Sequence, residues 1–212
     1  MKLIIGNKKY SSWSFRPWLA MRVNRINFEE ELIPFDFAAG NPAIKAAAPA
    51  GKVPVLVDGD LVIWESLAIL EYLAERFPEA GLWPDDIAAR ARARAMASEM
   101  HGGFGALRSE CPMNMARAVG AIGVSGAVHR DVARIETLWA EALAASGGPF
   151  LFGDFTNADA MFAPVVNRLD IYALSTHEAV ARYTAAMKAL PAWAEWETAG
   201  RAEPWIVEED EA

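Results

Sequence analysis

Residues 51–73 read GKVPVLVDGDLVIWESLAILEYL, and this stretch holds two strand signals followed directly by a helix signal. Two apolar runs, residues 53–57 and 61–64, flank Asp58-Gly-Asp60, which is a typical turn of a β-hairpin. A helix is predicted over residues 66–76, because leucines recur there every three residues and give one apolar face. The stretch therefore predicts an antiparallel hairpin closed by a helix.

Upstream of this stretch, strand and helix signals alternate. The β-branched run of residues 2–6 predicts a first strand, and residues 14–25 predict a helix. Residues 31–37 predict a second strand at a sheet edge, because Pro34 cannot donate a hydrogen bond to a neighbour. A weak helix signal over residues 41–48 completes the order βαβαββα, which predicts a small mixed sheet with helices on its faces.

The second part of the chain has helix signals only, and it follows a Pro- and Gly-rich break at residues 77–84. We expect an α/β domain over residues 1–80, a linker over 81–86 and an all-helical domain over 87–212. The helices of this second domain are predicted over residues 87–108, 126–145, 156–173, 177–190 and 191–200.

The charge of the chain argues against one class of partner. Its 212 residues carry 28 acidic and 20 basic side chains, a formal net charge of −8, and the hydrophobic fraction of 53% excludes wholesale disorder. Most of the excess acid lies in the helical half. It includes the run Glu208-Glu-Asp-Glu211, which we expect to be a solvated, frayed tail. No nucleic-acid partner is expected, because such a surface needs clustered Lys and Arg.

The single cysteine and the apolar runs limit the chemistry and the location of the protein. Cys111 alone can form neither an internal disulfide nor a cysteine-based metal site, and no metal site is predicted. We expect its thiol to be buried and inert. No apolar run approaches the roughly 20 residues of a membrane helix, and residues 1–6 have the pattern of a strand, not of a signal peptide. A soluble, cytoplasmic protein without membrane partners is expected.

The turn Tyr10-Ser-Ser-Trp-Ser14 lies between the first predicted strand and the first predicted helix. Ligands of open α/β sheets bind beyond the carboxyl ends of strands, next to helix N-termini that favour anions. A hydroxyl of Ser11 or Ser12 can there donate a hydrogen bond to a bound thiolate or carboxylate. The alternative is that these serines only cap the helix, and both interpretations stay open.

Two residue pairs beside the hairpin have the chemistry of a peptide-binding site. The Val53-Pro54 sequence indicates either a position at the edge of the sheet or a cis peptide bond. A cis bond would leave the backbone N–H and C=O of Val53 free to pair with an extended ligand. Ser66 at a helix start can receive a carboxylate, and Glu65 can receive an ammonium group. Together these residues predict a receptor for a small zwitterionic peptide.

These motifs together resemble the cytosolic glutathione transferases over essentially the whole chain. The resemblance rests on Ser11-Ser12-x-x-x-Arg16, on residues 51–56 and 64–73, and on residues 152–159 in the second half. The serine-type N-terminus is similar to the zeta class and related bacterial classes. The resemblance implies a thioredoxin-like domain followed by an all-helical domain, glutathione as the cosubstrate, and a homodimer.

The resemblance also implies which residues hold glutathione. Val53, before a cis Pro54, would pair its backbone with the cysteinyl part of the tripeptide. Glu65 and Ser66 would hold the γ-glutamyl end. Lys52 would approach the glycyl carboxylate.

The serine turn and the capping pattern complete this assignment. The resemblance implies that Ser11 or Ser12 faces the sulfur; Ser14 is assigned to helix capping, with a position at the sulfur as its alternative. The zeta pattern has Cys or Ala at the third position of the turn, whereas this chain has Trp13, which weighs against zeta-type isomerase activity. Thr156-Asn-Ala-Asp159 matches the family's N-terminal capping box, so its aspartate is assigned a structural role, not a catalytic one.

The electrophile is expected to bind between the domains. Met96, Met100, Phe104 and Arg108 follow one another at helical spacing, and methionine-rich surfaces suit varied ligands. They are interpreted as the wall of a substrate pocket, with a place in the core as the alternative. Arg108 would either meet an anionic substrate or pair with a carboxylate, and His101 is not expected to be catalytic.

The predicted activity is that of a detoxifying glutathione transferase that conjugates glutathione to hydrophobic electrophiles. The first alternative is a glutathione-dependent isomerase of the maleylacetoacetate type, which would leave glutathione unconsumed. The second alternative is a non-catalytic transferase-fold protein that acts as an interaction module and does not activate the thiol.

Overall fold

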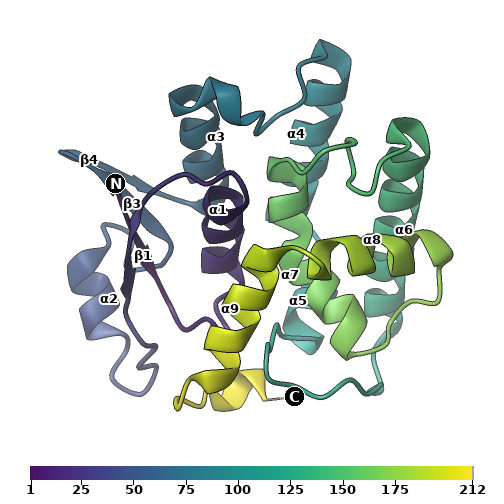
Figure 1. The fold of residues 1–212 in the computed structure, drawn as a ribbon. Coiled ribbons are helices and arrows are strands. Elements are labelled where there is room, and N and C mark those ends of the chain that lie inside the picture. Colours follow the sequence, from purple (N-terminus) through teal and green to yellow (C-terminus); the bar gives the residue numbers. More distant parts are fainter. Residues whose placement is uncertain (212) are drawn as a thin grey trace.

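The computed structural model describes residues 1–211, which form a thioredoxin-like part followed by a helical part (Figure 1). Four short strands make one mixed sheet in the order β2-β1-β3-β4. They are β1 (Lys2–Ile5), β2 (Glu29–Leu32), β3 (Val55–Asp58) and β4 (Leu61–Trp64). β2 is parallel to β1, whereas β3 pairs antiparallel with both β1 and β4. The expected mixed sheet is confirmed.

Successive residues of a strand point to opposite faces of the sheet, and this alternation decides where the flanking helices lie. These helices are α1 (Ser12–Val23), α2 (Pro42–Ala47) and α3 (Ser66–Arg76). Leu3 and Leu56 belong to the large core shared with α1 and α3, whereas Ile4 and Val55 form a small second core with α2. Figure 1 shows α2 on one side of the sheet, with α1 on the side of the helical part.

Beyond β4, residues 65–211 contain helices and turns but no strand longer than an isolated bridge. The helices are α4 (Ile87–Gly102), α5 (Gly105–Glu110), α6 (Gly126–Ser146), α7 (Asn157–Ile171), α8 (Glu178–Lys188) and α9 (Pro191–Ala202), with 3-10 turns η1 (Pro78–Ala80) and η2 (Glu208–Asp210). The buried α7 lies in the middle, where Arg16 of α1 donates a hydrogen bond to the Met161 carbonyl at 3.0 Å. Within the described chain, none of these helices has the length and apolar character needed to cross a bilayer.

A buried carboxylate holds the first turn of α7. Asp159 accepts hydrogen bonds from the backbone N–H of Thr156 (2.8 Å) and of Leu151 (3.0 Å), and from the Tyr183 hydroxyl (2.9 Å). Burial raises the pKa of Asp159 to about 6, although these donors favour its charged form. The predicted capping box is therefore confirmed.

The single helix predicted over residues 87–108 is wrong, because the chain breaks after Gly102. Gly103 lies so close to the preceding turn that a Cβ there would be 2.6 Å from the Glu99 carbonyl oxygen, and Phe104 has a positive φ of 55°. Because of this break, Arg108 belongs to the separate helix α5. Its side chain therefore points in a different direction from the one that a continuous helix would give.

Two other boundaries differ from the prediction. The helix α1 begins at Ser12, two residues earlier than expected, and β2 covers Glu29–Leu32 because the strand pairing ends before Pro34. The position of β2 at the sheet edge is confirmed.

The acidic run 208–211 is exposed at Glu208, Glu209 and Glu211, as expected, but it is not frayed, and that part of the prediction is wrong for the described residues up to 211. Glu203 accepts hydrogen bonds from the backbone N–H groups of Lys8 (2.6 Å) and Lys9 (3.0 Å), and Val207 is buried. The Tyr10 hydroxyl donates to Glu211. The segment therefore packs against the chain that leads into the serine turn.

Candidate functional site

The serine turn connects β1 to α1, and its three hydroxyls have different environments. The Ser11 hydroxyl donates to the Ser14 hydroxyl oxygen at 2.7 Å, and Ser14 accepts a bond from the Gly6 backbone N–H at 3.1 Å. Ser14 is fully buried and makes no capping bond, so its assignment to helix capping is wrong. Ser14 instead fixes the end of β1 to the first turn of the helix.

Ser12 is the first residue of α1 and differs from its neighbours. Its backbone carbonyl accepts a bond from Arg16 at 2.7 Å, whereas its hydroxyl has no hydrogen-bond partner within residues 1–211. Ser12 and Ser11 both line a cavity, and of the two hydroxyls only that of Ser12 is uncommitted. Ser12 is therefore the better placed to donate to a ligand.

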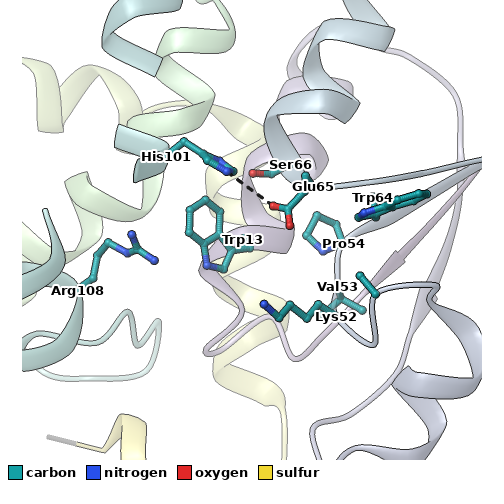
Figure 2. A pocket seen from close by; sticks show the side chains of 10 residues that line it. Trp13, Lys52, Val53, Pro54, Trp64, Glu65, Ser66, His101 and Arg108 are labelled. Atoms are coloured by element: carbon teal, nitrogen blue, oxygen red, sulfur yellow. Dashed lines mark ion pairs between the residues drawn. The ribbon is translucent and has the colours of Figure 1, made fainter. Parts of the chain in front are cut away.

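A first cavity, of about 190 Å³, opens between the hairpin and α4; we call it cavity one (Figure 2). Its walls carry side chains of both charges and two tryptophans. The lining residues are Trp13, Ala50, Lys52, Val53, Pro54, Trp64, Glu65, Ser66, His101 and Arg108. The Val53-Pro54 peptide bond is cis, and Val53 lies two residues before Val55, the first paired residue of β3. Ser66 is buried at the N-terminus of α3, where a helix favours an anion.

Glu65 faces the helical part of the molecule. Its carboxylate lies 3.7 Å from the His101 Nε2 atom, and Figure 2 shows the two side chains pointing toward one another. The His101 ring also stands edge-on to Trp13, with 5.2 Å between the ring centroids. His101 thus belongs to the wall of cavity one and contacts the residue proposed for an ammonium group.

A second cavity, of about 280 Å³, lies beside the first; we call it cavity two. The two cavities share Trp13, Lys52, Val53 and Arg108, so one wall separates them. Apolar side chains line much of cavity two, namely Phe35, Phe37, Ile44 and Met113, together with the serines. A ligand group bound at the shared wall would contact Ser12 from the side of cavity two.

Three arginines gather near this shared wall. The guanidinium carbon of Arg16 lies 4.0 Å from the Trp13 ring centroid and that of Arg108 lies 4.9 Å from it, and Arg168 lines cavity two. Within the described chain, all their hydrogen bonds go to backbone carbonyl oxygens. Burial and the charges of Arg168 and Arg108 lower the pKa of Arg16 well below its ordinary value. Cavity two is nevertheless suited to anions, because Lys52, Arg108 and Arg168 line it.

Comparison with known proteins decides the family. A sequence profile described as the glutathione S-transferase N-terminal domain matches residues 10–76, and one described as the glutathione S-transferase C-terminal domain matches residues 85–199. The second match alone covers more than half of the chain. The chain belongs to the glutathione S-transferase family.

Curated relatives of this family member match part of its length. Glutathione S-transferase 1 of Dianthus caryophyllus is 42% identical over 93 residues, which are 42% of this chain and 41% of the relative. A probable maleylacetoacetate isomerase of Caenorhabditis elegans is 38% identical over 86 residues, 41% of this chain and 40% of the relative. The matched region thus spans about two fifths of the length of these relatives.

Solved structures of glutathione S-transferase homologues share the fold over nearly the whole chain. A homologue from Burkholderia with bound glutathione superimposes with a TM-score of 0.74 at 20% identity, covering 95% of this chain and 98% of that chain. A maleyl pyruvate isomerase described as a bacterial zeta-class glutathione S-transferase gives a TM-score of 0.72 at 24% identity, covering 96% and 99%. The thioredoxin-like and all-helical architecture expected of the family is confirmed.

The transferase fold brings together most of the residues proposed from the sequence, but not the methionine stripe. Met96, Met100 and Phe104 are buried in the large core and line neither cavity, so for these three residues the alternative of a core position agrees with the structure. Arg108 is different, because the break after Gly102 directs it to the shared wall.

Sequence reasoning missed several residues that line the two cavities. Arg168 and Asp210 reach cavity two from α7 and from the C-terminal segment, and no local motif marks either of them. Trp13 was interpreted only as a departure from the zeta pattern, although it lies in the first turn of α1 with its ring against Arg16 of the same helix.

Proposed function

We propose that this glutathione S-transferase family member binds glutathione in cavity one and activates its thiol for attack on an electrophile in cavity two. The observation that carries the proposal is the wall shared by the two cavities, with the uncommitted Ser12 hydroxyl beside it. The sulfur of a tripeptide paired with Val53 would lie at this wall.

The charges of cavity one fit the two ends of glutathione. Glu65 would receive the ammonium group, and the first turn of α3 with the Ser66 hydroxyl would receive the adjacent carboxylate. Lys52 would neutralise the glycyl carboxylate, and the backbone of Val53 would pair with the cysteinyl peptide group. This set of donors and acceptors supports a zwitterionic tripeptide as the ligand.

Replacing Ser66 tests the binding role separately from thiol activation. Ser66→Ala should weaken glutathione binding about tenfold or more, because a hydrogen bond to a charged group contributes about 1.5–3 kcal/mol. The pKa of the bound thiol should stay unchanged, since Ser66 serves the other end of the tripeptide. Calorimetric titration gives the Kd, and Ser146→Ala, at the distant end of α6, is the matched control. An unchanged Kd for Ser66→Ala would remove Ser66 from the site.

The electropositive wall supports a second candidate reaction. Arg108 and Arg168 line cavity two, and neither donates to a carboxylate within residues 1–211. This favours an electrophile that carries a carboxylate, as an isomerase of the maleylacetoacetate type would require. A mass balance separates the two reactions, because conjugation consumes glutathione and isomerisation does not.

Replacing Arg108 tests the preference for anions. Arg108→Gln should raise the KM of a carboxylate-bearing electrophile about tenfold and change that of a neutral electrophile much less, because only the first loses a charge-assisted hydrogen bond. Steady-state kinetics with both classes measure this split. The control is Arg92→Gln, whose guanidinium pairs with Glu141 on the surface. Equal effects on both electrophiles would contradict an anion-binding role for Arg108.

The proposal includes a homodimer and the division into domains 1–80 and 87–212. The edge strand β4 exposes Val62 and Trp64 on one face of the sheet and Leu61 on the other, and we expect a second copy to cover apolar surface at this edge.

A further inference from the structure

The C-terminal segment of residues 203–211, which we call the strap, runs beside cavity two and is fixed at both ends. Glu203 accepts bonds from the backbone of Lys8 and Lys9 at its start. At its end, the Asn114 side-chain amide donates to the Asp210 carbonyl and to the Glu211 carboxylate, each at 3.3 Å. The backbone at Asp210 is therefore held in place by the body of the protein.

Asp210 is the only acid that lines cavity two within the described chain, and the cations Lys52, Arg108 and Arg168 line the same cavity. It is half-buried, and its carboxylate has no hydrogen-bond or ion-pair partner within residues 1–211. Burial raises the pKa of Asp210, and the positive charge of Arg168 offsets part of this rise. The neighbouring Glu209 is exposed, and Glu211 is engaged by Tyr10 and Asn114.

We propose that Asp210 is a specificity-determining residue of cavity two, whose negative charge offsets the arginines and reduces the affinity for electrophiles that carry a carboxylate. An anionic electrophile that approaches Arg108 and Arg168 meets a like charge on the strap, whereas a neutral electrophile of the same shape does not. This inference rests on the proposed function, because it assigns the electrophile to cavity two.

A matched pair of aryl chlorides tests the inference. The probes are 4-chloro-3-nitrobenzoate and 4-chloro-3-nitrobenzamide: in each, the thiolate sulfur bonds to the ring carbon that bears chlorine, and chloride leaves with the electron pair. The kcat/KM ratio of benzoate to benzamide should rise at least about threefold in Asp210→Asn, because a like charge has been removed. The benzamide rate should stay near that of the wild type.

Two control variants make the result specific. Asp210→Glu keeps the charge and should keep the wild-type ratio of kcat/KM values. Glu209→Gln removes an exposed charge at the adjacent position and should also leave this ratio unchanged. The inference is overturned if the ratio does not change in Asp210→Asn, or if Glu209→Gln raises it equally.

Binding of the benzoate alone separates this inference from the proposed function. If the wild type turns over neither probe, conjugation of such electrophiles fails, and the Kd of the benzoate should still fall at least about threefold in Asp210→Asn. An unchanged Kd in that variant overturns the role of Asp210 whatever the catalytic result.

Discussion

Ser12→Ala is expected to lower kcat/KM near neutral pH by about 10- to 100-fold, because a hydroxyl that bonds to a thiolate contributes about 1.5–3 kcal/mol. A hydrogen bond to the charged form lowers the pKa of a thiol, so its loss raises that pKa. The rising limb of the kcat/KM profile should therefore move by more than one pH unit to higher pH. Stopped-flow or steady-state rates across that range measure the shift, and glutathione binding should persist.

Ser11→Ala is the matched control for this prediction. The Ser11 hydroxyl already donates to Ser14, so its removal should affect the packing of the turn more than the thiol. A shifted profile in Ser11→Ala with an unchanged one in Ser12→Ala would reverse the two roles. If neither variant shifted the profile, neither of these two hydroxyls would act on the sulfur.

Asp159→Ala is expected to reduce the free energy of unfolding by about 3–5 kcal/mol, the largest effect on stability among these variants. Asp159 is fully buried and accepts bonds from Thr156, Leu151 and Tyr183, all of which lose their acceptor in the variant. Chemical denaturation at neutral pH measures the loss. Tyr183→Phe removes one of the hydrogen-bond donors and should reduce the free energy of unfolding by only about 1 kcal/mol. A loss below about 1 kcal/mol in Asp159→Ala would contradict the structural role.

The pH dependence of stability gives Asp159 a signature of its own. Its pKa in the folded protein is about 6, above the ordinary value of 3.8, so folding favours the protonated form. This contribution is complete below about pH 4 and is lost as the pH rises through about 6, an effect of about 3 kcal/mol. Asp159→Asn cannot titrate and should lack this decline.

The parts of the fold that were predicted correctly depend on local sequence. The hairpin and α3 follow from residues 51–76 alone, because the turn and the leucine spacing lie within one stretch. The α7 capping box likewise needs only Thr156 and Asp159. In each case, neighbours in sequence supply the interactions that fix the structure.

The errors arise where distant segments decide the outcome. The acidic run at 208–211 has the composition of a solvated tail, but Asn114 and Tyr10 hold it against the body. The methionine spacing around Met96 fits a pocket wall, and only the packing of α4 against α7 puts it in the core. Arg168 had no signal in the sequence, because a buried arginine is recognised only from its neighbours.

The central claim is that this chain stabilises the thiolate of glutathione, and a titration of bound glutathione tests it most directly. The thiolate absorbs in the ultraviolet, so its pKa can be read from the wild-type protein with saturating glutathione. We predict a pKa of about 6.5, about 2 pH units below that of a free thiol near 8.5, which corresponds to about 2.7 kcal/mol. A bound thiol that titrates near 8.5 would contradict the claim and would identify an interaction module instead.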